Sequence, residues 1–183
     1  TMLSVSDAKK IILENTQLMR PVMIPLDQAA GLVLAEDIYA PTDIPAFAQS
    51  SMDGYALLFK GWQQYKKLKV AGMVAAGSDN IPSILPEEAV RIFTGAAVPE
   101  GADTVVMQEK ARAENGDLII DDTLLVQGAN VRPKGSEIKA GDLALSEKSR
   151  LNPAAIGFLT GIGISNVNVY PAPSVSIIVT GNE

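Results

Sequence analysis

Pro41-Thr42-Asp43-Ile44-Pro45 is the segment that decides the architecture, because two prolines around a turn-forming pair are typical of a linker. Before it, residues 4–19 carry apolar side chains at helical spacing and predict an amphipathic helix that a serine at its start can cap. Residues 22–26 and 32–39 have the composition of short strands, joined by a helical turn at residues 27–31. The chain ahead of the linker therefore predicts a small α/β piece.

Beyond the linker the sequence changes to a β pattern. Short runs rich in β-branched residues predict strands at residues 68–76, 89–94, 104–109, 122–131 and 141–146. Within residues 111–121, the pair Asn115-Gly116 predicts a hairpin, because both residues tolerate positive φ. We therefore expect residues 46–144 to form an inserted all-β domain.

Helical character returns after this region. Asn152 is a suitable N-cap with Pro153 at the first helical position, and a strand is expected at residues 166–170. The simplest architecture folds residues 1–45 and 145–172 together as one discontinuous α/β linker domain. The expected fold class is thus α+β, mostly β, with an all-β domain inserted into a small α/β segment.

The last residues have a different pattern from the rest. Residues 174–179 are apolar and rich in β-branched side chains, which is typical of a strand buried in a parallel sheet. The turn Thr180-Gly181-Asn182-Glu183 follows this run. Because a parallel strand needs helices on both faces of its sheet, we expect residues 173–183 to be the first strand and turn of a further, truncated α/β domain.

The amino-acid composition excludes several kinds of chemistry. The 183 residues contain no cysteine and no histidine, which excludes disulfides, thiolate metal sites, histidine zinc sites and Ser-His-Asp triads. Catalysis must then use carboxylates, hydroxyls, Lys, Arg, backbone dipoles or a metal held by oxygen. A hard cation such as Mg²⁺ fits that set of ligands better than zinc does.

Charge and hydropathy narrow the kinds of partner. The net charge of −6 argues against a nucleic-acid surface, which needs clustered Lys and Arg. Residues 151–182 carry no charge, but prolines interrupt them, so they do not predict a membrane span. The polar N-terminus does not resemble a secretory signal. We therefore expect a cytoplasmic protein with a buried core, no nucleic-acid partner and no membrane partner.

Two segments in the β region bear groups that can act on a small anion. In Ser50-Ser51-Met52-Asp53-Gly54-Tyr55-Ala56, a carboxylate lies beside two hydroxyls, but a structural turn in which Asp53 bonds its own backbone is the alternative. In residues 94–103, a strand leads into a loop of small residues whose N–H groups can face an oxyanion. An ordinary loop between strands is the alternative there.

Two further segments suit the same kind of ligand. In residues 130–137, Arg132 and Lys134 suit a tetrahedral oxyanion, with Glu137 close behind them, although a solvated charged loop has the same composition. Residues 180–183 follow an apolar strand, which is where α/β folds place ligands and also where plain connections occur. Each segment is a weak signal alone, so their order and spacing decide.

Taken in order, these segments resemble the molybdopterin molybdenumtransferase family. The family pattern runs Ser-x-Met-Asp-Gly-Tyr-Ala, Thr-Gly-Ala-x-Val-Pro-x-Gly-Ala-Asp-x-Val-Val, Met-Gln-Glu, Arg-x-x-Gly and Thr-Gly-Asp-Glu. The matching stretches of this sequence are residues 50–56, 94–106, 107–109, 132–135 and 180–183. The resemblance covers essentially the whole chain.

The resemblance implies an activity and partners. Members of the family transfer molybdenum from molybdate to adenylylated molybdopterin with release of AMP, and they require Mg²⁺ or a similar divalent cation. They are homodimers whose cleft lies between the β domain of one subunit and the α/β domain of the other. A molybdopterin-adenylylating enzyme and molybdoenzyme apoproteins are the implied partners. Residues 173–183 would begin the molybdopterin-binding domain, so we expect this chain alone to bind the adenylylated substrate weakly or not at all.

The resemblance also implies which residues form the site. The catalytic residues implied are Asp53, Thr94 and Glu183. The substrate-binding residues implied are Ser51, Arg132, Lys134 and Glu137. Asp53 and Glu183 are the candidate ligands of a metal ion.

The sequence departs from the family pattern at three places. Ala48-Gln49 stand where Asp-Asn is usual, Ser136-Glu137 where Glu-Asp is usual, and Asn182 where Asp is common. One acid is thereby lost, and Glu137 has a longer side chain than the usual Asp. Two alternatives to the enzyme remain at this point: a non-catalytic scaffold or assembly module of the gephyrin type, and an oxyanion- or sugar-binding β domain unrelated to the family.

Overall fold

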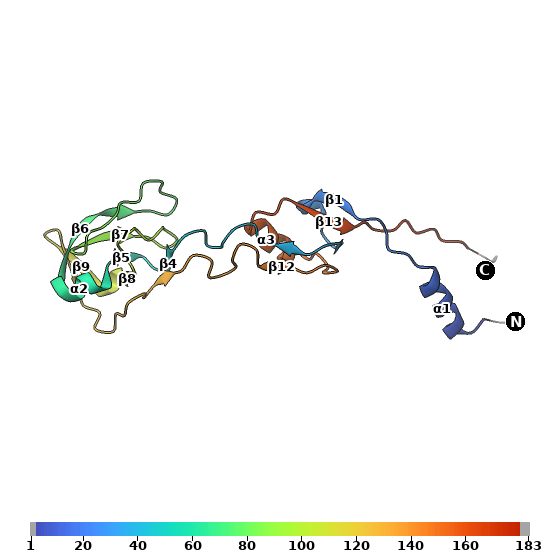
Figure 1. The fold of residues 1–183 in the computed structure, drawn as a ribbon, viewed down its shortest axis with the longest axis horizontal. Helices are drawn as coiled ribbons and strands as arrows, with labels where there is room; N and C mark the ends of the chain where they lie inside the picture. Colours follow the sequence, from blue (N-terminus) through green and yellow to red (C-terminus); the bar gives the residue numbers. More distant parts are fainter. Residues whose placement is uncertain (1–2, 180–183) are drawn as a thin grey trace. The chain divides into compact units, whose positions relative to one another are not determined.

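The structure is a computed structural model that describes residues 3–179 and divides the chain into two compact units (Figure 1). Unit 1 combines the residues up to Pro41 with those from Gly141 onward, and unit 2 is Thr42–Ala140. The sequence predicted that the inserted domain runs from residue 46 to residue 144. The fold is α+β and mostly β, as the sequence predicted.

Unit 2 is built on a six-stranded sheet with the order β8-β5-β7-β6-β10-β9. The strands are β5 (Gly54–Leu57), β6 (Lys67–Val74), β7 (Glu88–Ile92), β8 (Thr104–Met107), β9 (Ala111–Glu114) and β10 (Asp117–Ile120). All neighbours are antiparallel except β6 and β7, which run parallel. A separate two-stranded ladder joins β4 (Gln49–Ser50) to β11 (Val131–Arg132), and the short helix η2 (Gln108–Lys110) follows β8.

The predicted hairpin is confirmed. Strands β9 and β10 pair antiparallel around Asn115 and Gly116, whose φ angles of 52° and 86° are the left-handed values that a tight two-residue turn requires. Several other strands of unit 2 also lie within a few residues of their predicted positions. The parallel pairing of β6 with β7 was not foreseen, because a short crossover leaves no clear signal in the sequence.

Both faces of the central sheet are buried. Successive residues of a strand point to opposite faces, and here both members of the pairs Ala56/Leu57, Ala89/Val90 and Val105/Val106 are fully buried. One face packs a cluster that includes Val90 and Ile92, and the other packs Leu68 and Leu118 beside Phe59 and Trp62. The strands therefore read as continuous apolar runs, and the polar residues that matter lie where the strands end.

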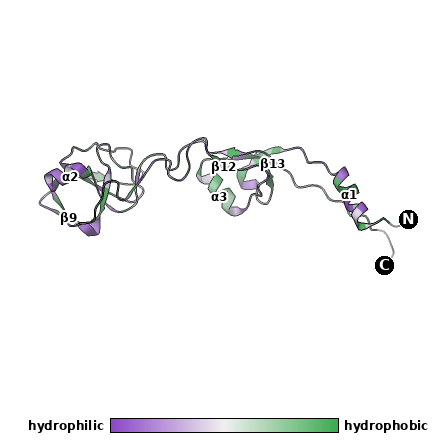
Figure 2. Ribbon diagram, turned by 60° about the horizontal axis from the view of Figure 1, so that its bottom comes forward, coloured by the Kyte–Doolittle hydropathy of each residue, from purple (hydrophilic) through white to green (hydrophobic). Residues whose placement is uncertain are grey.

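Unit 1 contains a three-stranded antiparallel sheet, β1-β13-β2, and a two-stranded ladder of β12 with β3. Its elements are α1 (Val5–Asn15), β1 (Val22–Pro25), η1 (Leu26–Gln28), β2 (Val33–Leu34), β3 (Ile38–Tyr39), β12 (Leu143–Leu145), α3 (Pro153–Gly161) and β13 (Asn166–Tyr170). Helix α3 begins as predicted, since the Asn152 side chain accepts a hydrogen bond from Ala155 N at 2.8 Å. Figure 2 shows α3 as a mainly hydrophobic helix, and its Leu159 is fully buried.

Three predictions about elements of the chain were wrong, and one helix was not predicted. The first helix ends at Asn15 rather than near residue 19, and residues 32–39 form two short strands instead of one. Residues 122–130 form turns, because Gly128 and Asn130 have positive φ (81° and 56°), which a strand cannot contain. Helix α2 (Phe59–Tyr65) was missed altogether.

The C-terminal run also differs from its prediction. Residues 174–179 form no strand, and Val175, Ile177 and Ile178 are about four-fifths exposed. An isolated strand of this kind leaves its backbone groups without partners, so composition alone cannot form it. The turn at residues 180–183, including Glu183, lies outside the described residues. Within residues 3–179, no helix has the length and apolarity needed to cross a membrane.

Candidate functional site

Asp53 lies in the bend between β4 and β5 and is bound by a residue from a distant loop. Its Oδ1 accepts hydrogen bonds from both the backbone N–H and the hydroxyl of Thr94, each at 2.8 Å. The Thr94 N–H and then its hydroxyl hold the pKa of Asp53 below its usual value; burial opposes them less strongly, and the positive charge of Arg91 adds the smallest lowering effect. Asp53 is therefore a fixed, ionised carboxylate at neutral pH.

The side-chain contacts of Asp53 differ from those expected for the structural alternative. In the structural alternative Asp53 would bond its own backbone, but its carboxylate instead reaches a residue 41 positions away. The local turn is made by Ser50, whose buried hydroxyl donates to Met52 O at 2.6 Å and accepts from Met52 N at 3.3 Å. Ser50 shapes the turn and leaves the Asp53 side chain available for a contact across the sheet.

Gly54 follows Asp53 because the backbone of β8 leaves no room for a side chain. A Cβ at Gly54 would lie 1.8 Å from the Val106 carbonyl oxygen, far inside van der Waals contact. The close approach is the reason, and its neighbour is protein backbone.

The loop that carries Thr94 does not form an open oxyanion cradle. The N–H of Thr94 goes to Asp53, that of Gly95 to Ser50 O (2.8 Å), that of Ala96 to Phe93 O (2.9 Å), and that of Val98 to Ala48 O (2.9 Å). These donors form a turn within the loop and bind the loop to residues in and next to β4. These four N–H groups are therefore bonded within the protein and do not face an oxyanion, and a loop sequence alone does not show where its donors bind.

Arg91 and Gln108 complete the surroundings of Asp53, and neither was among the predicted site residues. Arg91 Nη1 donates to Gly54 O at 2.9 Å, and its Nη2 donates to the side-chain oxygen of Gln108. Gln108 N in turn donates to Asp53 O at 3.0 Å. The available signal was a single cation in the otherwise apolar run Ala89-Val90-Arg91-Ile92-Phe93, close before Thr94.

The basic loop forms a second group of side chains within unit 2. Arg132 pairs with Glu137 (3.2 Å) and Lys134 pairs with Asp43 (3.4 Å). Asp43 also accepts from Ala140 N at 2.9 Å, and that N–H, together with Lys134, holds the pKa of Asp43 below its usual value. Arg132 and Glu137 are about half exposed, so their ion pair is weak and an anionic ligand can compete for the cation.

The structure does not bring the two groups into side-chain contact. Ser51 N donates to Asn130 O at 2.9 Å, and β4 pairs with β11 so that Arg132 lies opposite Gln49. Because the pairing is antiparallel, the chain moves away from Arg132 as it runs from Gln49 to Asp53. Among the predicted site residues, Asp53 and Thr94 are brought together, as are Arg132 and Glu137. Lys134 pairs with a residue outside the predicted set, and Ser51 directly follows β4, between the two groups in sequence.

Asp53 could supply one ligand to a magnesium ion. Oδ2 of Asp53 has no hydrogen-bond partner within residues 3–179, so it can coordinate a cation while Oδ1 stays with Thr94. In the same part of the chain no three acidic side chains lie close enough together to hold a metal. This fits Mg²⁺ bound through one carboxylate, with water and substrate oxygens as the other ligands. The other candidate ligand, Glu183, lies outside the described residues.

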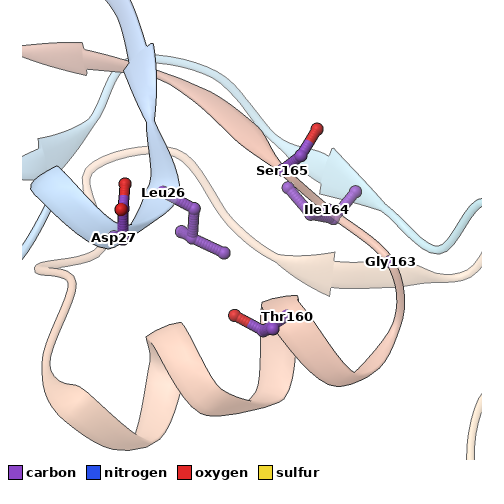
Figure 3. Close-up of a pocket in the computed structure, with 6 residues that line it drawn as sticks. All are labelled: Leu26, Asp27, Thr160, Gly163, Ile164 and Ser165. Carbon is purple, nitrogen blue, oxygen red and sulfur yellow. The ribbon is translucent and has the colours of Figure 1, made fainter.

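Unit 1 contains an open cavity that includes none of these residues. Its volume is about 450 Å³, and it lies between η1, the end of α3 and the start of β13 (Figure 3). The lining residues are Leu26, Asp27, Thr160, Gly163, Ile164 and Ser165. The Thr160 hydroxyl already donates to Ile156 O at 2.8 Å. Asp27 is the charged residue of the lining. The cavity lacks the convergent polar groups of a specific ligand site.

Comparison with known proteins identifies relatives along the whole chain. Curated molybdopterin molybdenumtransferases from Haemophilus influenzae and Staphylococcus epidermidis are each 36% identical over all of this chain, and molybdopterin molybdenumtransferase 2 from Mycobacterium tuberculosis is 34% identical. The chain spans about 45% of the length of the first two and 46% of the third.

Solved structures and a protein family agree with these matches. Two crystal structures of the molybdopterin biosynthesis MoeA protein from Pyrococcus horikoshii match with TM-scores of 0.82 and 0.78 at 29% identity. They cover 94% and 92% of this chain, and 45% and 46% of their own. The family described as the MoeA N-terminal region (domain I and II) matches residues 3–163. The chain therefore belongs to the MoeA N-terminal family.

Proposed function

We propose that this chain is the N-terminal portion of a molybdopterin molybdenumtransferase. The proposed reaction transfers molybdenum from molybdate to adenylylated molybdopterin and releases AMP. The observation that carries the proposal is the contact of Asp53 with Thr94. It joins the two segments that most resemble the family, in a chain whose whole length matches curated molybdenumtransferases.

Asp53 and Thr94 supply the proposed catalytic centre. Thr94 uses both of its donors on one carboxylate oxygen, which keeps Asp53 ionised and fixes the direction of its second oxygen. A carboxylate held in this way can orient water or a cation beside the departing AMP. Mg²⁺, when bound there, would neutralise phosphate charge. Glu183 is the third proposed catalytic residue.

The basic loop is the proposed binding site for the oxyanion. Molybdate and phosphate are tetrahedral anions, which suit the planar fork of Arg132 and the point charge of Lys134. Both cations are now held by carboxylates at the protein surface, Glu137 and Asp43. Exchange of the half-exposed Arg132–Glu137 pair for a dianion would cost little, and the Lys134 ammonium is itself mostly exposed, so the loop can accept an anion. Ser51 is proposed to contact the same substrate from the edge of β4.

Three further features belong to the proposal. The active protein is a homodimer, because the family's cleft takes one wall from each subunit. It acts in the cytoplasm between a molybdopterin-adenylylating enzyme and molybdoenzyme apoproteins. It needs Mg²⁺, so chelation should stop the reaction and added Mg²⁺ should restore it. Sedimentation of the full-length protein tests the dimer.

The test is molybdate-dependent release of AMP by the full-length protein that carries this sequence. Purified protein is incubated with adenylylated molybdopterin, with and without molybdate, and AMP and molybdenum cofactor are measured. We expect both products to form together, and only with molybdate. Binding of molybdopterin without release of AMP would favour the gephyrin-type scaffold, and neither binding nor release would favour an unrelated β domain.

A further inference from the structure

The guanidinium of Arg91 makes four contacts next to the bend that carries Asp53. It donates to the Gly54 carbonyl at 2.9 Å and to the Gln108 side chain, and it lies over the rings of Tyr55 (5.3 Å to the centroid) and Phe93 (4.9 Å). Tyr55 is also the direct cross-strand neighbour of Arg91. Two hydrogen bonds and two cation–π contacts leave this side chain little rotational freedom.

These contacts close a ring through the backbone of Asp53. Arg91 donates to the Gln108 side chain, Gln108 N donates to Asp53 O at 3.0 Å, and Arg91 also donates to Gly54 O. The carbonyls of two successive residues, Asp53 and Gly54, are therefore both held by this ring. Thr94 holds the Asp53 carboxylate from another. The backbone carbonyl and the side-chain carboxylate of Asp53 are therefore both held by residues distant in sequence.

We propose that Arg91 is a positioning residue that acts through Gln108 and the Gly54 carbonyl to hold Asp53 in its reactive placement. Its consequence for catalysis rests on the proposed function, whereas the placement of Asp53 is a property of this chain. A purely structural arginine would stabilise the sheet without affecting the geometry of the carboxylate.

The charge-conserving substitution Arg91→Lys separates geometry from charge. A compact ammonium group lacks the planar fork with which the guanidinium spans the Gly54 carbonyl and the Gln108 side chain, so the ring is weakened while the positive charge stays. In the full-length protein we expect kcat for AMP release to fall by roughly 10- to 100-fold with KM little changed, as for a displaced catalytic group. Gln108→Leu removes one acceptor and should act in the same direction, whereas Gln108→Glu keeps an acceptor oxygen and should retain activity.

Arg112→Lys is the matched control. Arg112 lies on β9 of the same sheet, is about half exposed, and pairs with Glu114 and Asp121 at the surface. It should leave kcat and KM unchanged. Wild-type kcat in Arg91→Lys would contradict the proposal, and so would a rise in KM alone, which indicates direct binding of the substrate by Arg91. If Arg91→Lys does not fold, Gln108→Leu carries the same test.

A second measurement on this chain keeps the two proposals distinguishable. The Thr94 amide proton, observed by NMR at one fixed neutral pH, reports the carboxylate oxygen to which it donates. We expect its chemical shift to move in Arg91→Lys and to stay at the wild-type value in Arg112→Lys. An unchanged Thr94 amide shift in Arg91→Lys would refute positioning. Absence of AMP release by the wild-type full-length protein, with the NMR effect present, would refute only the proposed function.

Discussion

Asp53 and Thr94 are 41 residues apart in sequence, yet two hydrogen bonds of 2.8 Å join Thr94 to a single oxygen of the Asp53 carboxylate. One bond comes from the backbone and the other from the hydroxyl, so they can be removed separately. The bond from the backbone N–H lowers the pKa of Asp53 more than the bond from the hydroxyl does. A Thr94 variant that removes only the hydroxyl therefore tests the smaller of these two effects on the pKa of Asp53.

Thr94→Val should raise the pKa of Asp53 part of the way toward its ordinary value of 3.8, because it removes the hydroxyl and keeps the backbone donor. Since the folded-state pKa is depressed, the stability that Asp53 contributes is present above pH 3.8 and is lost as the pH falls through the folded-state value. In Thr94→Val the loss should still begin near pH 3.8, but it should be smaller and should be complete at a higher pH than in the wild type. Carbon-13 NMR titration of the carboxyl group measures the pKa, Thr94→Ser is the control that keeps the hydroxyl, and an unchanged pKa in the valine variant would refute the assignment.

Gly54→Ala should destabilise unit 2, because the new Cβ would lie 1.8 Å from Val106 O and the sheet must move to admit it. The expected loss in the free energy of unfolding is at least about 1–3 kcal/mol, the usual cost of overpacking. Urea denaturation measures it. Gly157→Ala in α3 is the control, since nothing lies within 4 Å of its Cβ and alanine favours a helix. Equal stability of the two variants would contradict the close approach of β5 and β8.

Asn152→Ala should weaken the start of α3 in unit 1. Its side chain satisfies the N–H of Ala155, which has no acceptor inside the helix, so its removal should cost about 1 kcal/mol. Asn152→Ser keeps an oxygen that can cap the helix and should stay close to wild type. Amide hydrogen exchange of the first turn of α3 is the direct measurement. Slower exchange in the alanine variant than in the serine variant would be inconsistent with the cap.

Asp43→Ala should lower the urea midpoint of unit 2 more than Lys134→Met does. Asp43 accepts the Ala140 N–H as well as pairing with Lys134, so its loss leaves a backbone donor without its acceptor. Lys134 is about three-fifths exposed and contributes only a screened ion pair. Added salt should therefore reduce the effect of Lys134→Met and leave most of the effect of Asp43→Ala. The opposite order would show that the ion pair, and not the backbone hydrogen bond, holds the segment.

Local signals in the sequence predicted local structure well. Asn152-Pro153 predicted the start of α3, and Asn115-Gly116 predicted the β9–β10 hairpin, because each pair determines the conformation of its own backbone. The strand expected at residues 174–179 did not form, since a strand depends on neighbours that its own sequence does not specify. Helix α2 was missed because it contains Gly61, whose small size is needed to pack against Pro86.

The candidate site was predicted only in part, because it too depends on contacts between residues distant in sequence. The motif residues Asp53 and Thr94 were found, but the sequence could not show that Thr94 spends both donors on Asp53. Arg91 and Gln108 were not predicted, because their role depends on β5, β7 and β8 lying side by side. Long-range pairing of strands determines which side chains meet, and a single sequence contains no direct record of it.

The most direct test of the central claim replaces Asp53 with Asn in the full-length protein and measures molybdenum insertion into adenylylated molybdopterin. Asp53→Asn keeps the size of the side chain and an oxygen for Thr94, and it removes the negative charge. Asp79→Asn, in an exposed loop between β6 and β7, makes the same change of charge outside the site. We predict that Asp53→Asn abolishes insertion without unfolding the protein and that Asp79→Asn inserts at the wild-type rate; wild-type insertion by a folded Asp53→Asn protein would contradict the account.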